Sequence, residues 1–251
     1  MQMLTAERRH EILVRLARDD RVVVSELVAS LGVSEDTVRR DLRELAEKGL
    51  VHRVHGGALV PASPTASFVR RLELSRDVKA GLAEAALPLL ERAQVIVLDG
   101  GTTNLELASR LPPTFGGTVV TNSPPTASVL ANHPNAEVLL IGGKLLKEAQ
   151  VTVGPSAVEA FRAIRADLCV LGGCAFQPEI GVMTTDADEA PVKRAMIECS
   201  GQVVALATAD KLALTSPWVV AALQELDYLV TDAAAEATRP YAAAGIDVVS
   251  V

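Results

Sequence analysis

The chain has 251 residues, of which 49% are hydrophobic and 22% are charged, and its formal net charge is −7. This composition indicates a folded, globular protein, and the length allows one or two domains with a real core. No apolar run approaches the roughly 20 residues that span a bilayer, and the charged, amphipathic start MQMLTAERRHEIL is unlike a signal peptide, so we expect a cytoplasmic protein without membrane contact.

The charge is divided unevenly along the chain. Residues 1–60 hold ten Lys or Arg and ten Asp or Glu, so the whole net charge of −7 falls on residues 61–251. Such an asymmetry suggests two domains with different tasks. The three cysteines, Cys169, Cys174 and Cys199, lack CxxC spacing, so we expect neither a disulfide framework nor a metal site, and we predict no cofactor.

The first sixty residues predict a helix-turn-helix. Ile12, Leu13 and Leu16 are spaced as on one side of a helix. A short second helix is expected from an N-cap at Ser25 to about Leu31, with Gly32 ending it. Ser34 is expected to cap a third helix, EDTVRRDLRELAEKG, that stops at Gly49. Two short helices joined by a tight glycine turn are typical of DNA-binding helix-turn-helix motifs.

The third helix separates into an apolar and a basic side. Val38, Leu42 and Leu45 follow i, i+4, i+7 spacing and should face the core. The opposite arc carries Arg39, Arg40 and Arg43, with Thr37 near its beginning, and such guanidinium groups can contact guanine edges or phosphates. An ordinary solvated surface, with acidic neighbours compensating the arginines, is the alternative for an isolated helix; the position after a helix-turn favours DNA contact.

The segment LVHRVHGGALV predicts a β-hairpin, because alternating residues flank a glycine pair. A helix-turn-helix followed by a hairpin is a winged helix. Arg53, with His52 and His55 nearby, would then lie along the DNA backbone or minor groove.

The stretch VSELVASLGVSEDTVRRDLRELAEKGLVHRVHGGA resembles the N-terminal domain of DeoR-family transcriptional regulators, with SEDTVRRDL and RVHGGA as its most diagnostic parts. The resemblance implies operator DNA as a partner and places the DNA contacts at Ser34, Thr37, Arg39, Arg40 and Arg43. Asp41 also matches, and we interpret it as an ion-pair partner that orients an arginine.

Residues 61–75 are predicted to be a linker, because VPASPTASF has two prolines and three hydroxyl residues in nine positions. From Arg76 to the end, helical segments alternate with short apolar runs such as QVIVLD, TVVTN, DLCVLGG and QVVALAT. This alternation predicts an α/β domain over residues 76–251 with a mainly parallel sheet.

Polar residues that follow the predicted strands are expected to share one rim, where ligands bind in such sheets. VLDGGTTNLELASRL reads as a strand that turns into a helix whose first N–H groups can hold an anion. The rim residues are Asp99, Gly100, Gly101, Thr102, Thr103, Thr121, Asn122, Ser123, Gly142, Gly143, Lys144, Gly172, Gly173, Thr208, Ala209, Asp210 and Lys211.

TTDADEAPVKRAMIE adds charge to the same rim. Pro191 requires a helix that starts near Asp188, which makes Glu189 and Lys193 i, i+4 neighbours. A surface pair is the plain interpretation, but a lysine close to a phosphate would be a direct counter-charge. We expect Thr102, Thr103 and Lys193 to hold the phosphate and Asp99 to accept from a sugar hydroxyl.

This half resembles the sensor domain of the same family, with DGGTT, TNS, GGK, DADEAPVKRAM and ADK in the family's order. The resemblance implies a Rossmann-like α/β fold related to ribose-5-phosphate isomerase, glucosamine-6-phosphate deaminase and the coenzyme A transferases. The usual alanine-aspartate-serine-serine-lysine run is shortened to ADK, which leaves the role of Lys211 open.

The sequence features suggest three possible function classes. A sugar-phosphate isomerase or deaminase would use Asp188, Glu189 and Lys193 for acid–base work, but an isomerase has no use for a fused winged helix. A DNA-architectural protein conflicts with the net charge of −7. We predict a non-enzymatic repressor of a sugar or sugar-alcohol catabolic operon, released by a phosphorylated sugar and acting as a homo-oligomer, a dimer or a tetramer.

Overall fold

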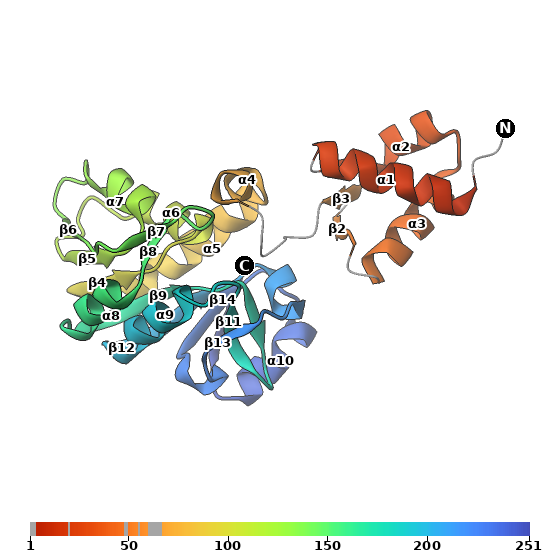
Figure 1. The fold of residues 1–251 in the computed structure, drawn as a ribbon. Coiled ribbons are helices and arrows are strands. Elements are labelled where there is room, and N and C mark those ends of the chain that lie inside the picture. The colour runs from red at the N-terminus through yellow and green to blue at the C-terminus, as the bar shows by residue number, and fades with distance from the viewer. Residues whose placement is uncertain (1–3, 20, 48–49, 55, 60–66) are drawn as a thin grey trace. The chain divides into compact units, whose positions relative to one another are not determined.

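The computed structural model describes residues 4–19, 21–47, 50–54, 56–59 and 67–251 (Figure 1). The chain divides into two compact units, residues 1–63 and residues 64–251, called here the winged-helix unit and the α/β unit. Of the segment predicted as a linker, residues 61–66 lie outside the described residues. Its later part is not a plain connection, because Phe68–Glu73 forms helix α4.

The winged-helix unit contains helices and a three-stranded sheet: α1 (Thr5–Asp19), β1 (Arg21–Val23), α2 (Val24–Leu31), α3 (Glu35–Glu47), β2 (His52–Val54) and β3 (Gly57–Leu59). β2 and β3 form the expected antiparallel hairpin, and β1 pairs with the other side of β3. His55 lies outside the described residues. The winged helix-turn-helix predicted from the sequence is therefore confirmed.

Two local expectations about the turn have different outcomes. Ser25 is not the N-cap of α2, because the helix already begins at Val24 and the extended residue before it is Val23. β1 runs straight into α2, and the sequence pattern gave no sign of this short strand. Gly32 does end α2, with φ of 64°, the left-handed conformation that glycine adopts at little cost.

A buried carboxylate joins α1 to α3. Val38, Leu42 and Leu45 are buried as predicted, and they pack with Ile12 and Leu16 of α1. Asp41 lies on the same side of α3 and is only 1% exposed. Its two oxygens accept from Arg8 Nε at 2.5 Å and from Arg9 Nε at 2.8 Å. The ion-pair role predicted for Asp41 is present, but its partners belong to α1, not to the arginines of α3.

The α/β unit is built on a seven-stranded parallel sheet in the order β15-β14-β12-β9-β4-β5-β6. The strands are β4 (Val95–Leu98), β5 (Thr118–Thr121), β6 (Glu137–Leu140), β9 (Ala166–Gly172), β12 (Ser200–Leu206), β14 (Tyr228–Thr231) and β15 (Asp247–Ser250). The mainly parallel sheet was predicted; its strand order was not.

Helices cover both faces of this sheet. One face packs Ile96, Leu98 and Leu206 against α5 (Arg76–Leu90), α6 (Thr102–Ser109) and α7 (Pro124–Leu130). The other face packs Val97 and Ala205 against α8 (Pro155–Arg162), α9 (Glu189–Glu198) and α10 (Ala235–Ala243). Neighbouring residues of a strand point to opposite faces, so each apolar run supplies both cores.

Short strands lie outside the main sheet. β7 (Lys144–Leu146) pairs with β8 (Val151–Val153), and a second small sheet joins β10 (Ala175–Gln177), β11 (Gly181–Thr184) and β13 (Trp218–Ala221). Two 3-10 turns, η1 (Ala209–Ala213) and η2 (Leu223–Glu225), complete the described elements. Cys169 is a fully buried core residue, as expected. Within the described residues, every helix is too short or too polar to cross a membrane.

We predict that Asp41→Ala lowers the free energy of unfolding of the winged-helix unit by about 3–5 kcal/mol, because it leaves buried Arg8 without its carboxylate. The single tryptophan, Trp218, lies in the α/β unit. Helix loss measured by circular dichroism should therefore shift to lower urea concentration while the tryptophan transition stays in place.

Glu35→Gln is the control for that variant. The Glu35–Arg39 pair is 2.6 Å long, but both side chains are more than half exposed, so its loss should cost less than about 1 kcal/mol. Equal effects of the two variants would contradict the structural role given to Asp41.

Candidate functional site

The exposed side of α3 carries the residues predicted to contact DNA. The side chains of Arg39, Arg40 and Arg43 are exposed. Ser34 precedes the helix, and its hydroxyl accepts from the Thr37 backbone N–H at 3.3 Å, which makes it the N-cap expected from the sequence. The two hydroxyls of Ser34 and Thr37 are 2.9 Å apart. A basic, solvent-facing helix with a polar first turn is what contact with a DNA groove requires.

The wing adds a second basic element to this surface. Arg53 of β2 is exposed and lines a cleft together with Arg39; Val24, Leu42, Gly56 and Gly57 form the rest of its wall. Two guanidinium groups from different elements therefore flank one concave surface.

The strand order places a ligand cleft at the middle of the parallel sheet. From β4 the chain continues through β5 to β6 on one side, and it later returns to β9 and builds β12, β14 and β15 on the other side. β4 and β9 are neighbours, with Leu98 opposite Val170. Ligands bind at such a switch point, beyond the carboxyl ends of the two strands.

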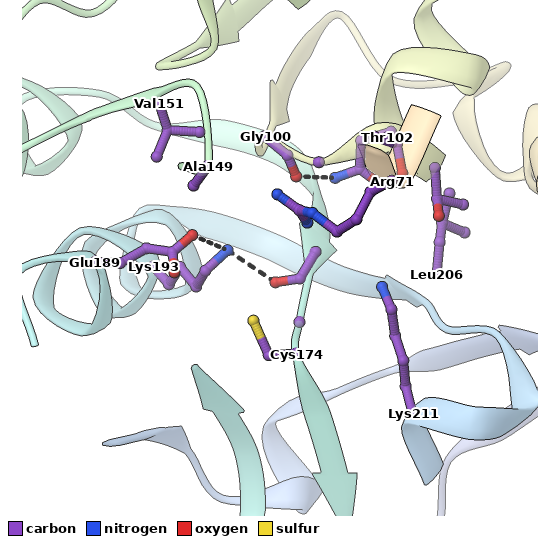
Figure 2. Close-up of a pocket in the computed structure, with 15 residues that line it drawn as sticks. Arg71, Gly100, Thr102, Ala149, Val151, Cys174, Glu189, Lys193, Leu206 and Lys211 are labelled. Carbon is purple, nitrogen blue, oxygen red and sulfur yellow. Dashed lines mark hydrogen bonds and ion pairs between the residues drawn. The ribbon is translucent and has the colours of Figure 1, made fainter. Parts of the chain in front are cut away.

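The pocket found there combines the ends of β4, β9 and β12 with residues from α4, the loop before β8, α9 and η1 (Figure 2). Its lining residues are Arg71, Gly100, Gly101, Thr102, Thr103, Asn104, Ala149, Val151, Gly172, Gly173, Cys174, Glu189, Lys193, Leu206 and Lys211.

The turn after β4 presents backbone N–H groups to this pocket. Gly101 has φ of 112°, a conformation that favours glycine, and α6 starts directly after it. The first backbone bond of α6 runs from Leu105 N–H to Gly101 O at 2.9 Å, so the N–H groups before Leu105 have no partner within the helix. Thr102 and Thr103 lie in this first turn, where the helix dipole favours an anion.

Thr102 is not the cap of its own helix, because the N-cap is Gly101 and no side chain caps it. Asn104 fixes the turn instead: its Nδ2 donates to Asp99 O at 3.0 Å and to Val170 O at 3.1 Å. Its Oδ1 is buried and has no partner among the described residues. An acceptor of this kind beside a pocket suits a ligand hydroxyl.

Lys193 is held by two carboxylates. Its Nζ forms a short ion pair with Asp99, lies 3.3 Å from Glu189 Oε1 and donates to Gly172 O at 2.9 Å. The Asp99 oxygens also accept from Gly100 N–H at 2.7 Å and from Gly172 N–H at 2.8 Å. Lys193 and Asp99 are almost fully buried. The network therefore ties β4, β9 and α9 together beneath the pocket.

This geometry corrects two roles predicted from the sequence. Lys193 lines the pocket, but Asp99 and Glu189 already compensate its charge, so it is not a free counter-charge for a phosphate. Asp99 is 1% exposed, lies outside the lining residues, and has its oxygens occupied by Lys193, Gly100 and Gly172. It therefore positions other groups and cannot be the acceptor for a sugar hydroxyl.

The ionisation of the network follows from burial and from these contacts. Burial would lower the pKa of Lys193, but Asp99 and Glu189 hold it above its ordinary value. Burial raises the pKa of Asp99 although Lys193 and the Gly172 N–H oppose this. Burial would also raise the pKa of Glu189, yet Lys193 and the Thr184 hydroxyl hold it below its ordinary value. Lys193 thus stays charged and Glu189 stays ionised.

Several predicted rim residues lie away from the pocket, because their strands are not central. Thr121, Asn122 and Ser123 follow β5: Ser123 caps α7, and Asn122 donates to Thr152 O at 2.9 Å. Gly142 and Gly143 follow β6, the edge strand. None of these five, nor Lys144, Asp188 and Asp210, is among the lining residues.

Lys144 and Asp188 instead form an exposed pair at 2.9 Å. Asp188 does not line the pocket, whereas Glu189 and Lys193 do. Of the three residues of the enzymatic alternative, only these two belong to the pocket.

Arg71 lines the pocket but was not predicted from the sequence to do so. It belongs to α4, a six-residue helix inside the predicted linker, and six residues are too few for a periodic pattern. Asn104 was missed although it lies within the predicted turn. Gly172 at the end of β9 and Gly173 after it, both expected at the rim, line the pocket, and Cys174 follows them.

Comparison with known proteins agrees with both units. Residues 8–64 match a family model described as the DeoR-like helix-turn-helix domain, and residues 75–233 match the DeoR C-terminal sensor domain. The chain is 37% identical to the HTH-type transcriptional regulator GlpR of Haloferax volcanii over 254 residues, which covers 98% of each chain.

Two further relatives are named as repressors. The HTH-type transcriptional repressor GlcR of Bacillus subtilis is 34% identical and is covered to 89% of its length by 92% of this chain. The glycerol-3-phosphate regulon repressor of Haemophilus influenzae is 31% identical, with 89% of this chain and 88% of the relative covered.

Solved structures give a weaker likeness. A ribose-5-phosphate isomerase in complex with phospho-erythronic acid is 17% identical with a TM-score of 0.40, and the match covers 55% of this chain and 54% of that one. An eIF2B delta subunit of Chaetomium thermophilum is 14% identical with a TM-score of 0.43, covering 81% and 64%. Likenesses at this level transfer no chemistry.

We predict that Lys193→Met lowers the free energy of unfolding of the α/β unit by about 3–5 kcal/mol, because it leaves two buried carboxylates without their cation. Lys144→Met is the matched control, since the Lys144–Asp188 pair is exposed and should contribute little to stability. Urea titration followed by Trp218 fluorescence compares the two variants. A Lys193 variant as stable as the control would refute the structural role of the network.

Proposed function

Since the chain belongs to the DeoR family of transcriptional repressors, we propose that a phosphorylated sugar or sugar alcohol binds the pocket of the α/β unit and releases the protein from its operator. The regulated genes are then those of a sugar or sugar-alcohol catabolic operon. One relative is named for the regulon of glycerol 3-phosphate, a phosphate ester of a sugar alcohol. The observation that carries the proposal is a helix N-terminus with two threonines opening into a cation-lined pocket at the switch point of the sheet.

The pocket suits an organic phosphate better than an apolar ligand. Thr102, Thr103 and the backbone N–H groups of the first turn of α6 supply donors for phosphate oxygens. Lys211 of η1 supplies a cation from the opposite wall (Figure 2). Asn104 Oδ1 and Glu189 supply acceptors for hydroxyl groups. A small molecule with one phosphate and several hydroxyls matches this set.

We also propose that the repressor acts as a homo-oligomer, a dimer or a tetramer. A single winged helix buries too little surface for the affinity of a specific operator complex. Two copies read two half-sites, and their spacing follows from the symmetry of the protein. The predicted DNA contacts are Ser34, Thr37, Arg39, Arg40, Arg43 and Arg53.

We predict that Arg39→Ala and Arg40→Ala each weaken binding to an operator, selected from a random-sequence DNA pool by the full chain, by about 1–3 kcal/mol. Both guanidinium groups are exposed on α3, so their loss should leave the fold intact. Gel-shift titration measures the affinity, and Arg162→Ala, which removes an exposed arginine of α8, is the control. Wild-type affinity in both α3 variants would remove this helix from the DNA interface.

We predict that one member of a panel of glycerol 3-phosphate, hexose phosphates and pentose phosphates releases the operator and raises the melting temperature of the full chain. At 100 times its dissociation constant such a ligand stabilises by roughly 2.7 kcal/mol. Thr103→Val should keep operator affinity but need about tenfold more ligand for release, because it loses one hydroxyl donor to a charged group.

The matched control is Thr118→Val, which removes an exposed hydroxyl on β5 outside the pocket. If no compound of the panel releases the operator from the wild-type protein, the proposed effector class is refuted. An unaltered ligand response of Thr103→Val would show that the turn after β4 does not contact the ligand.

A further inference from the structure

Arg71 enters the pocket from outside the sheet. Figure 2 shows its guanidinium group directed into the space between the Gly100–Thr102 turn and the pair of Lys193 and Glu189. Its Nε is buried and has no hydrogen-bond partner among the described residues. A buried N–H without an acceptor is unfavourable, and the cost is removed when a bound anion accepts from it.

The pocket carries a surplus of positive charge near Arg71. Lys193 is compensated by Asp99 and Glu189, but Arg71 and Lys211 line the pocket without an ion pair among the described residues. Lys79 of α5 is close enough to be affected: burial first, then repulsion from Lys211 and Arg71, lower its pKa to about 8, although Asp210 and Glu106 act in the opposite direction. Burial likewise lowers the pKa of Lys211. Cations that repel each other in a polar pocket are what an anion stabilises.

Helix α4, which carries Arg71, is hydrogen-bonded to the loop that forms one wall of the pocket. The Phe68 N–H donates to Glu148 O at 2.8 Å, and Glu148 precedes Ala149, which lines the pocket. The Arg71 guanidinium lies 5.8 Å from the centre of the Phe68 ring. Lys79 Nζ donates to Arg71 O through a short hydrogen bond. α4 is therefore hydrogen-bonded both to the loop before β8 and to α5.

The position of α4 in the chain gives this contact a consequence. α4 begins at Phe68 and is the first described helix after the winged-helix unit, whose last strand ends at Leu59. The other lining residues belong to the sheet and its later elements. Arg71 is thus the lining residue closest in sequence to the DNA-binding unit.

We propose that Arg71 binds the phosphate of the effector and that α4 passes this contact to the segment leading to the winged helix. The inference rests on the proposed function and names the coupling element within it. A ligand shifts an equilibrium only when it binds two states differently, and the unpartnered Arg71 N–H supplies a contact that exists only when the pocket is occupied.

The test uses the full chain, its selected operator and the releasing ester from the panel of sugar phosphates. Arg71→Ala and Arg71→Gln remove the charge, and Arg92→Ala removes an exposed arginine outside the pocket as the control. Isothermal titration measures ester binding, gel shift without ester measures operator affinity, and gel shift with saturating ester measures release. Trp218 fluorescence in urea checks the fold, and Arg71→Gln replaces Arg71→Ala if the latter is unfolded.

We expect both Arg71 variants to keep wild-type operator affinity, to bind the ester about 10- to 100-fold more weakly, and to retain more than half of the DNA complex at saturating ester. Wild-type ester affinity in both variants overturns the phosphate-binding role. Full release by an Arg71 variant once it is saturated overturns the coupling role. No response of the wild-type and Arg92→Ala proteins to any ester overturns the proposed function and this inference together.

Discussion

The ion pair between Lys193 and Asp99 is the contact on which the α/β unit depends. It joins α9 to the end of β4, and Lys193 also donates to Gly172 O at the end of β9, so one ammonium group fixes the two strands that border the switch point. Glu189 shares the same lysine, so Lys193 is engaged by carboxylates on two sides. Arg71 and Lys211 line the same pocket without an ion pair among the described residues and remain available to an anion.

In the winged-helix unit, a buried carboxylate likewise holds a helix in place. α3 must be held firmly and must still expose its arginines, and Asp41 meets both demands because its carboxylate is used by Arg8 and Arg9 of α1. Burial would raise the pKa of Asp41, but the hydrogen bonds from Arg8 and Arg9 lower it, so it stays ionised at neutral pH. A carboxylate engaged with α1 cannot neutralise Arg40 or Arg43 on the exposed side. In each unit a buried carboxylate, Asp41 or Asp99, holds a helix in place through an ion pair. Other cations stay available to bind DNA in the first unit and an anion in the second.

The parts predicted well from the sequence are those set by local pattern. Helical periodicity is a local property, so the sequence correctly places Val38, Leu42 and Leu45 on one side of α3. The turn from β4 into α6 is also local, so the sequence correctly places Thr102 and Thr103 there. The residues after β5 and β6 were predicted to lie at the ligand rim because the order of the strands in the sheet was unknown. That order depends on pairing between distant segments, which no short segment encodes. Arg71 lies in a helix of six residues, too short to show a periodic pattern. The pairing of Lys193 with Asp99, 94 residues apart, needed the fold itself.

The same contacts explain how the pocket would bind the proposed sugar phosphate without transforming it. Isomerisation needs a carboxylate that reaches a carbon-bound proton with a pKa near the working pH. Asp99 is buried and accepts from three donors, so it has no access to a ligand. Glu189 does line the pocket, but Lys193 and Thr184 stabilise its ionised form and hold its pKa below the ordinary value, which makes it a weaker base. The groups that could remove a proton are thus committed to structure, while the donors of the α6 turn remain free to bind.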